Sequence, residues 1–178
     1  CNDSIDNVSK KENSASLKQI EYSETDFLND PNLPNCFKEF YLKKLDPNSN
    51  DSCGQHLIDS IDSHDKLRQP YYFLTLTRTF DKADGAYSES VCHFSMEYIK
   101  NNTNDFLHQF LTNKNLTDDD LELWANITKM ELIDFVETDA KKEVENYINI
   151  LKGKFAALND KQNEKLNKLI KLLDSNYP

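Results

Sequence analysis

The sequence predicts an all-α protein, in which a disordered N-terminal tether precedes a single irregular helical bundle or a short helix-pair solenoid of about eight helices. Apolar side chains recur every three or four residues along most of the chain, as on one face of an α-helix. The chain has only 3 Gly and 5 Pro, too few for the many turns of a β-barrel or β-sandwich. The connections between periodic segments are short, as between antiparallel neighbouring helices.

The polar N-terminal segment, residues 1–25, is expected to form the tether, and residues 26–178 one helical domain. Such a polar segment buries too little apolar surface to fold. A cysteine followed by a polar segment is typical of processed bacterial lipoproteins, so Cys1 is the candidate lipidation residue. The alternative is a chain that begins at a cysteine by chance.

The first two helices of the domain are expected over residues 34–45 and 54–66. Pro34 suits the first turn of a helix, because a proline lacks the N–H that has no intrahelical partner there. The polar residues 46–52 between the two helices are expected to form a loop.

The segment YYFLTLTRTF, residues 71–80, fits two kinds of structure. Its threonines alternate with other residues, as in a strand. Tyr72, Leu76 and Phe80 recur every four residues, as in a helix. The chain offers no second strand, and a lone strand leaves its backbone groups without partners, so a helix is expected.

Five further helices are expected in the C-terminal half, each beginning at a polar cap residue. The caps are Asp84, Thr103, Thr117, Thr138, and Asn159 or Asp160. The helix after Thr117 is expected to run to about residue 136, and the helix after Thr138 to Leu158. Core-facing side chains of the former are expected to be Leu123, Trp124, Ile127 and Met130.

Three cysteines lie in the predicted domain, and an oxidising envelope would allow one disulfide. The candidate pair is Cys36 and Cys53, which the first helix and its loop separate; that loop is long enough to bring the two Cα atoms within about 6 Å. The alternative pair is Cys53 with Cys92. Cys92 has apolar neighbours and is expected to be a buried thiol.

The net charge of -10, from 31 acids and 21 bases, argues against a nucleic-acid partner. A nucleic-acid-binding domain normally presents a basic face. Only Arg68 and Arg78 are arginines, so planar, bidentate contacts to phosphate are scarce. No nucleic-acid partner is expected.

No catalytic or metal-binding motif is found in the sequence. The histidines lie in four different predicted elements, without metal-ligand spacing: His56, His64, His93 and His108. Asp46, Asn48 and Asn50 begin like a calcium loop, but Asp51 stands where that loop needs Gly. Walker, GxSxG and GxGxxG motifs are missing. The expectation is therefore no catalytic residue, no metal and no cofactor.

Charge is unevenly distributed along the C-terminal half. Residues 103–140 carry nine acids and two bases, whereas residues 151–178 carry six lysines and three acids. Glu131 and Asp134 lie in the last turn of a predicted helix, where the helix dipole disfavours acids, and Glu137 follows them. These three are the candidate partner-binding residues, for a protein with a basic surface. The alternative is a solvated acidic face.

The segments FLTLTRTFDKADGAYSESVCHFSMEYIKNNTNDFLHQFL and LELWANITKMEL combine an apolar helix, an Asp-Gly-Ala turn, an amphipathic helix and a short helix. In this order they resemble uncharacterised α-helical envelope lipoproteins of Bacteroidetes-type bacteria, over residues 70–135. The resemblance implies no known activity.

The expected function is non-enzymatic: a membrane-tethered protein-interaction module of the bacterial cell envelope. The lipid would anchor it in the outer membrane, facing the periplasm or the cell surface, with no other membrane contact. One alternative is an immunity protein that neutralises a periplasmic toxin. A second is an enzyme without a recognisable motif.

Overall fold

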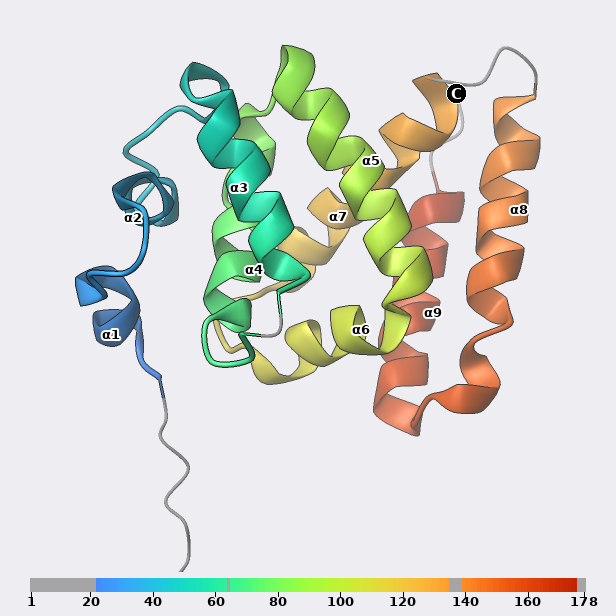
Figure 1. Cartoon of the computed structure of the whole chain (residues 1–178). Helices are drawn as coiled ribbons and strands as arrows, with labels where there is room; N and C mark the ends of the chain where they lie inside the picture. Colours follow the sequence, from blue (N-terminus) through green and yellow to red (C-terminus); the bar gives the residue numbers. More distant parts are fainter. Residues whose placement is uncertain (1–21, 64, 135–138, 176–178) are drawn as a thin grey trace, which may run out of the picture.

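The computed structural model describes residues 22–63, 65–134 and 139–175, and within these ranges the chain is helical with no strand (Figure 1), which confirms the all-α prediction. Five α-helices form the N-terminal part: α1 (Glu24–Asn29), α2 (Asn35–Tyr41), α3 (Asp51–Ile61), α4 (Gln69–Thr77) and α5 (Gly85–Asn101). Four follow: α6 (Thr103–Thr112), α7 (Asp118–Asp134), α8 (Ala140–Lys152) and α9 (Asp160–Asp174). Three short 3-10 helices lie between them: η1 (Pro47–Ser49), η2 (Phe80–Lys82) and η3 (Phe155–Ala157).

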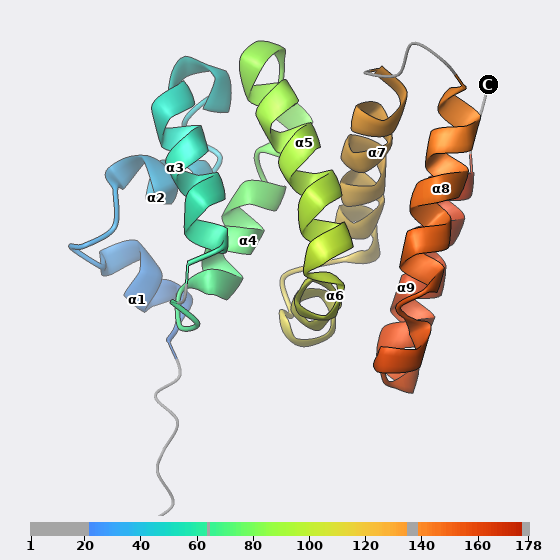
Figure 2. The ribbon, with the colours of Figure 1, turned by 45° about the vertical axis from the view of Figure 1, so that its right-hand side comes forward.

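The helices form a row with α1 and α2 at one end and α8 and α9 at the other (Figure 1). The turned view in Figure 2 shows α3, α5, α7 and α8 in succession along this row. Helix α7 packs against α4, α5, α8 and α9, so it joins the two halves of the row. The core is continuous from one end of the row to the other.

Helix α1 lies partly within the segment that the sequence assigned to the tether. Its N-cap is Ser23, whose side chain accepts from the backbone N–H of Asp26, while the Asp26 side chain accepts from the N–H of Ser23. Phe27 is fully buried. Residues 24 and 25, which the sequence assigned to the tether, are therefore helical.

The segment over residues 71–80 is helical, as expected, and most of it belongs to α4. The hydroxyl of Thr75 donates to the carbonyl oxygen of Tyr71 at 2.6 Å, and that of Thr77 donates to Phe73 at 2.9 Å. These threonines thus satisfy their hydroxyls inside their own helix, which lets them be buried without a partner strand.

Helix α8 ends at Lys152, short of the predicted end at Leu158. The chain turns at Gly153 and forms η3 before α9. The N-cap of α8 is Asp139, whose side chain accepts from the N–H of Lys142, and the predicted cap at Thr138 lies outside the described residues. In the sequence, apolar residues keep their helical spacing beyond the end of α8. They do so because Phe155 and Leu158 are also partly buried against the core.

The core-facing side of α7 is rotated from the one that the sequence predicted. Its fully buried residues are Leu121, Trp124, Ala125 and Thr128, at helical spacing. Trp124 is 0% exposed, as expected, but Met130 is 43% exposed, so its inward prediction is wrong. Met130 lies outside this row of buried residues, whereas its neighbour Lys129 is buried.

A disulfide joins Cys36 of α2 to Cys53 of α3, with the two Cα atoms 6.5 Å apart. It fixes the N-terminal helices to the rest of the row. Cys92 is buried, and its Sγ lies 3.9 Å from the Ser88 hydroxyl.

Candidate interaction surface

A groove of about 890 Å³ runs along α9. Four lysines of α9 line it: Lys161, Lys165, Lys168 and Lys171. Because they are spaced three or four residues apart, they share one side of the helix. Leu111, at the end of α6, is 39% exposed and adds an apolar side chain to the lining. The groove therefore combines a row of lysines with one apolar side chain. Three acids also line it: Asp118, Asp160 and Glu164.

The start of α7 provides the acid that faces this row. The Asp118 carboxylate lies 3.0 Å from the Lys165 amine and 2.6 Å from that of Lys168. Hydrogen bonds from Lys168 and Lys165 hold the pKa of Asp118 below its usual value. The acidic segment and the basic C-terminal helix, which the sequence showed as separate charge runs, thus meet in the fold.

The other two lysines of the groove are exposed, and no ion pair of the described residues involves them. Lys171 lies in the last turn of α9, where the helix dipole favours a cation. Lys161 lies in the first turn, where the same dipole disfavours one. The helix dipole of α9 therefore gives no reason for a cation at Lys161.

Lys129 of α7 fixes the C-terminal end of α9 against α7. The Lys129 amine donates to the carbonyl oxygen of Leu172 at 3.1 Å and to that of Ser175. Burial lowers the pKa of Lys129, while its position at the C-terminal end of α9 suits a cation. Asp118 at the start of α7 and Lys129 in its C-terminal half thus hold the helix that lines the groove.

Glu131, one of the three candidate partner-binding residues, is largely enclosed by the fold. Its side chain is 12% exposed, and its Oε1 lies 2.9 Å from Nδ1 of His93 on α5. Its Oε2 is buried without a hydrogen-bond partner. Asp134 ends α7, and Glu137 lies outside the described residues. The structure therefore gives Glu131 an internal partner. The side chain of Asp134 and the whole of Glu137 lie outside the described part of the chain, so their contact with a partner stays a prediction.

A second, smaller hollow of about 280 Å³ is polar. The Asp105 carboxylate in its lining accepts from the Tyr98 hydroxyl and from the Gln69 amide, each at 2.8 Å. Burial, and then Asp105, raise the pKa of Tyr98. Partial burial, followed by Asp59 and Asp105, raises the pKa of Asp62, which also lines the hollow. These contacts tie α4, α5 and α6 together, and they account for the polar lining as part of the fold.

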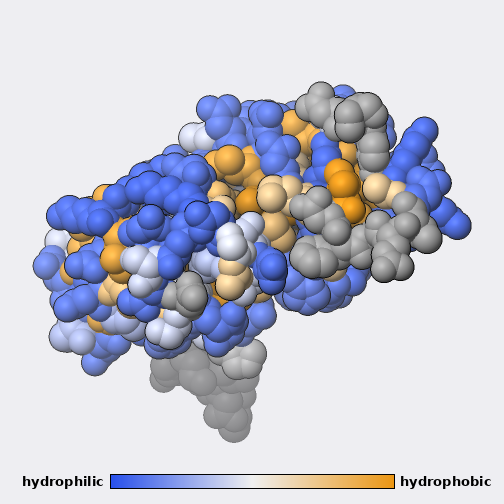
Figure 3. Space-filling model, turned by 90° about the horizontal axis from the view of Figure 1, so that it is seen from above, coloured by the Kyte–Doolittle hydropathy of each residue, from blue (hydrophilic) through white to orange (hydrophobic). Residues whose placement is uncertain are grey.

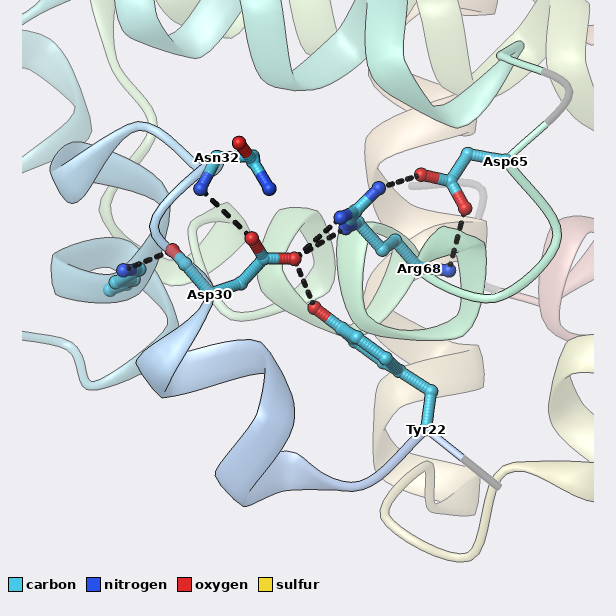
Figure 4. Close-up of polar contacts among 6 residues, drawn as sticks. Tyr22, Asp30, Asn32, Asp65 and Arg68 are labelled. Carbon is cyan, nitrogen blue, oxygen red and sulfur yellow. Dashed lines mark hydrogen bonds and ion pairs between the residues drawn. The ribbon is translucent and has the colours of Figure 1, made fainter. Parts of the chain in front are cut away.

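A polar cluster holds the chain where it enters the domain (Figure 4). Asp30 accepts from Nε and Nη2 of Arg68, at 2.8 and 2.6 Å, and from the Tyr22 hydroxyl at 2.9 Å. The Asn32 N–H also donates to Asp30, and Asp65 pairs with Nη1 of Arg68. The second arginine, Arg78, donates to the Tyr41 carbonyl oxygen. Both arginines therefore make internal contacts.

Seen from above, hydrophilic side chains cover most of the surface over α3, and apolar ones gather toward the half that contains α5, α7 and α8 (Figure 3). The most exposed large apolar residues come from different elements: Leu42, Leu67, Leu111, Met130 and Ile150. Of these, Leu111 lines the lysine groove.

The remaining predictions concern lipid, metal and membrane. Cys1 lies outside the described residues, and lipidation there stays a prediction. Within the described ranges no group of three or more His, Cys, Asp or Glu side chains could hold a metal ion. Of the helices described, none has the length and apolar character needed to cross a membrane.

Comparison with protein-family models, with curated proteins and with solved structures gave no match. The function proposed below is therefore argued from the fold and the charged groove alone.

Proposed function

We propose that the chain is a non-enzymatic helical interaction module of the bacterial cell envelope, and that it contacts a partner protein along α9. The observation that supports this is the groove of about 890 Å³, whose lining includes four lysine side chains and one exposed leucine. Small-molecule sites carry only a few fixed polar groups, whereas seven of the ten residues that line this groove are charged. Such a lining suits a polypeptide that lies along the helix.

The proposal includes the immunity function as a special case, in which the partner is a toxin. It moves the expected contact from the acidic residues around Glu131 to α9, because Glu131 is enclosed and paired with His93. Attachment to the outer membrane through Cys1 stays a prediction from the sequence.

In vivo photo-crosslinking tests the proposal. A photo-reactive amino acid replaces Asn167, which lines the groove, and in a second variant replaces Glu39, which is exposed on α2 at the far end of the row. Irradiation of the native cells is expected to give a defined protein adduct from position 167 only. No adduct from position 167, or the same adducts from both positions, would contradict the proposal.

A further inference from the structure

We infer that the α9 groove takes an acidic helical segment of the partner, one that presents carboxylates on one face and a single apolar residue among them. This inference rests on the proposed function, and it names the chemistry of the partner. The lysines that line the groove span from Lys161 to Lys171, about 15 Å along the helix at 1.5 Å per residue. A partner helix of about three turns has this length.

Charge complementarity identifies the occupant. Asp118 forms ion pairs with Lys165 and Lys168. At the two ends of the row, Lys161 and Lys171 are exposed and take part in no ion pair of the described residues. A helical segment with two carboxylates about ten residues apart could place one on Lys161 and the other on Lys171. Carboxylates between these ends would compete with Asp118, whose side chain is 56% exposed, for Lys165 and Lys168.

The apolar position of the groove sets a second requirement. Leu111 is 39% exposed beside these lysines. An apolar side chain of the partner would cover it and remove apolar surface from water. An acidic segment that lacks such a residue would keep the charge contacts but lose this contribution.

Two other anionic partners fit less well. The chain carries a net charge of -10, which repels a long polyanion such as a nucleic acid. Asp160 and Glu164 also line the groove, and they would face the phosphates of a nucleic acid or of an anionic membrane. A discrete acidic helix can place its carboxylates on the lysines and avoid these acids, whereas a uniformly charged surface cannot.

The test uses the full chain and a synthetic amphipathic peptide of four helical turns, with Glu along one face and one Leu among them. A matched peptide carries Gln in place of each Glu. Fluorescence anisotropy is expected to show binding of the Glu peptide, weaker at high salt, and at least about tenfold weaker binding of the Gln peptide, since long-range charge attraction is what it lacks.

Two charge-reversal variants locate the contact. Lys161→Glu with Lys171→Glu is expected to weaken binding of the Glu peptide by about tenfold or more, as for reversed charges at an interface. Lys44→Glu with Lys82→Glu makes the same change of net charge at the α2 end of the row, where both lysines are exposed, and is expected to change binding less than about twofold. Circular dichroism and the urea midpoint show whether the Lys161→Glu, Lys171→Glu variant folds. If it does not fold, Lys161→Gln with Lys171→Gln replaces it in the binding measurement.

Equal effects of the two charge-reversal pairs would overturn the inference, because net charge alone would then explain the binding. Equal affinity for the Glu and Gln peptides would overturn it too. So would groove-dependent binding of phosphatidylglycerol vesicles or of a single-stranded oligonucleotide without binding of the Glu peptide. If a partner is crosslinked at position 167 and charge reversal of Lys161 and Lys171 leaves the crosslinking yield unchanged, the inference fails and the proposed function stands. If no partner is crosslinked there, the proposed function itself fails.

Discussion

At the scale of single residues, Trp124 is fully buried among aromatic rings. Its ring stacks on Phe73, with 4.6 Å between ring centroids, and meets Phe80 and Phe106 edge to face. Its Nε1 donates to the Thr77 hydroxyl at 2.9 Å. The side chain thus joins α4, α6 and η2 to α7, and its one polar atom is satisfied inside the core.

Replacing Trp124 with Ala is expected to lower the free energy of unfolding by about 3–5 kcal/mol, because the cavity cannot fully collapse among packed rings. Trp124→Phe is the matched control: it keeps an aromatic ring and loses the hydrogen bond to Thr77, which is worth about 1 kcal/mol. Urea unfolding followed by far-UV circular dichroism measures both. An alanine variant with the wild-type midpoint would contradict the packing described.

Asp30 makes stability depend on pH in the acid range. The N–H of Asn32 and then Arg68 hold the pKa of Asp30 at about 2, below its ordinary value of 3.8. Because the pKa is lower in the folded state, the contribution of Asp30 to stability is full above pH 3.8 and is lost as the pH falls toward 2. The stability gap between the wild type and Asp30→Asn is therefore expected to be widest near neutral pH and to close in that window.

Urea midpoints measured from neutral pH down to the acid limit of folding test this expectation. Glu122→Gln, which removes an exposed carboxylate from α7, is the control and is expected to change stability little at any pH. A gap between the wild type and Asp30→Asn that stays constant with pH would show that Asp30 does not titrate as described.

At the scale of elements, the start of α7 shows how local chemistry fixes a helix boundary. The Thr117 hydroxyl accepts from the N–H of Asp120 at 3.3 Å and donates to its carboxylate at 2.8 Å. The same carboxylate accepts from the N–H of Thr117 at 2.7 Å. Thr117 and Asp120 thus satisfy each other's N–H groups, as in a capping box. The predicted cap at Thr117 is confirmed.

Thr117→Ala is expected to reduce the free energy of unfolding by about 0.5–2 kcal/mol, the range for loss of an N-cap hydroxyl. Asn126→Ala, at an exposed position in the middle of the same helix, is the control and is expected to be neutral or slightly stabilising, because Ala is the better helix former. Thermal or urea unfolding measures the two. Equal effects would mean that the cap does not stabilise α7.

At the scale of the whole molecule, a disulfide and a polar cluster hold the N-terminal helices on the row. The Cys36–Cys53 disulfide links α2 to α3 across 17 residues of sequence. Arg68, at the start of α4, binds Asp30 at the end of α1. The two connections act on the same end of the molecule, where α1 and α2 lie apart from the central helix α7 (Figure 1).

Replacing both Cys36 and Cys53 with Ala is expected to destabilise the domain by about 3 kcal/mol, as for a disulfide that closes a loop of this length. Cys92→Ala changes a buried residue outside the disulfide and is the control for cysteine removal. Urea unfolding of the oxidised wild type, the reduced wild type and the variants compares them. If reduction leaves the wild-type midpoint unchanged, the disulfide contributes nothing to stability.

The sequence by itself determined the helical class, the position of α4 and the starts of α7 and α9. These depend on apolar periodicity and on cap residues such as Thr117 and Asn159, which act within a few residues of themselves. Helix ends were harder to predict, because the apolar side chains that follow α8 pack on the core from a 3-10 helix instead of from an α-helix.

Only the tertiary structure decided which charges are available to a partner. Glu131 and Lys129 lie in an acidic run that reads as a solvated face, yet one is enclosed against His93 and the other is buried at the end of α9. Asp118 meets Lys165 across 47 residues of sequence. A charge is paired or free according to which distant residues the packing brings within a few ångströms of it, and no local pattern carries that information.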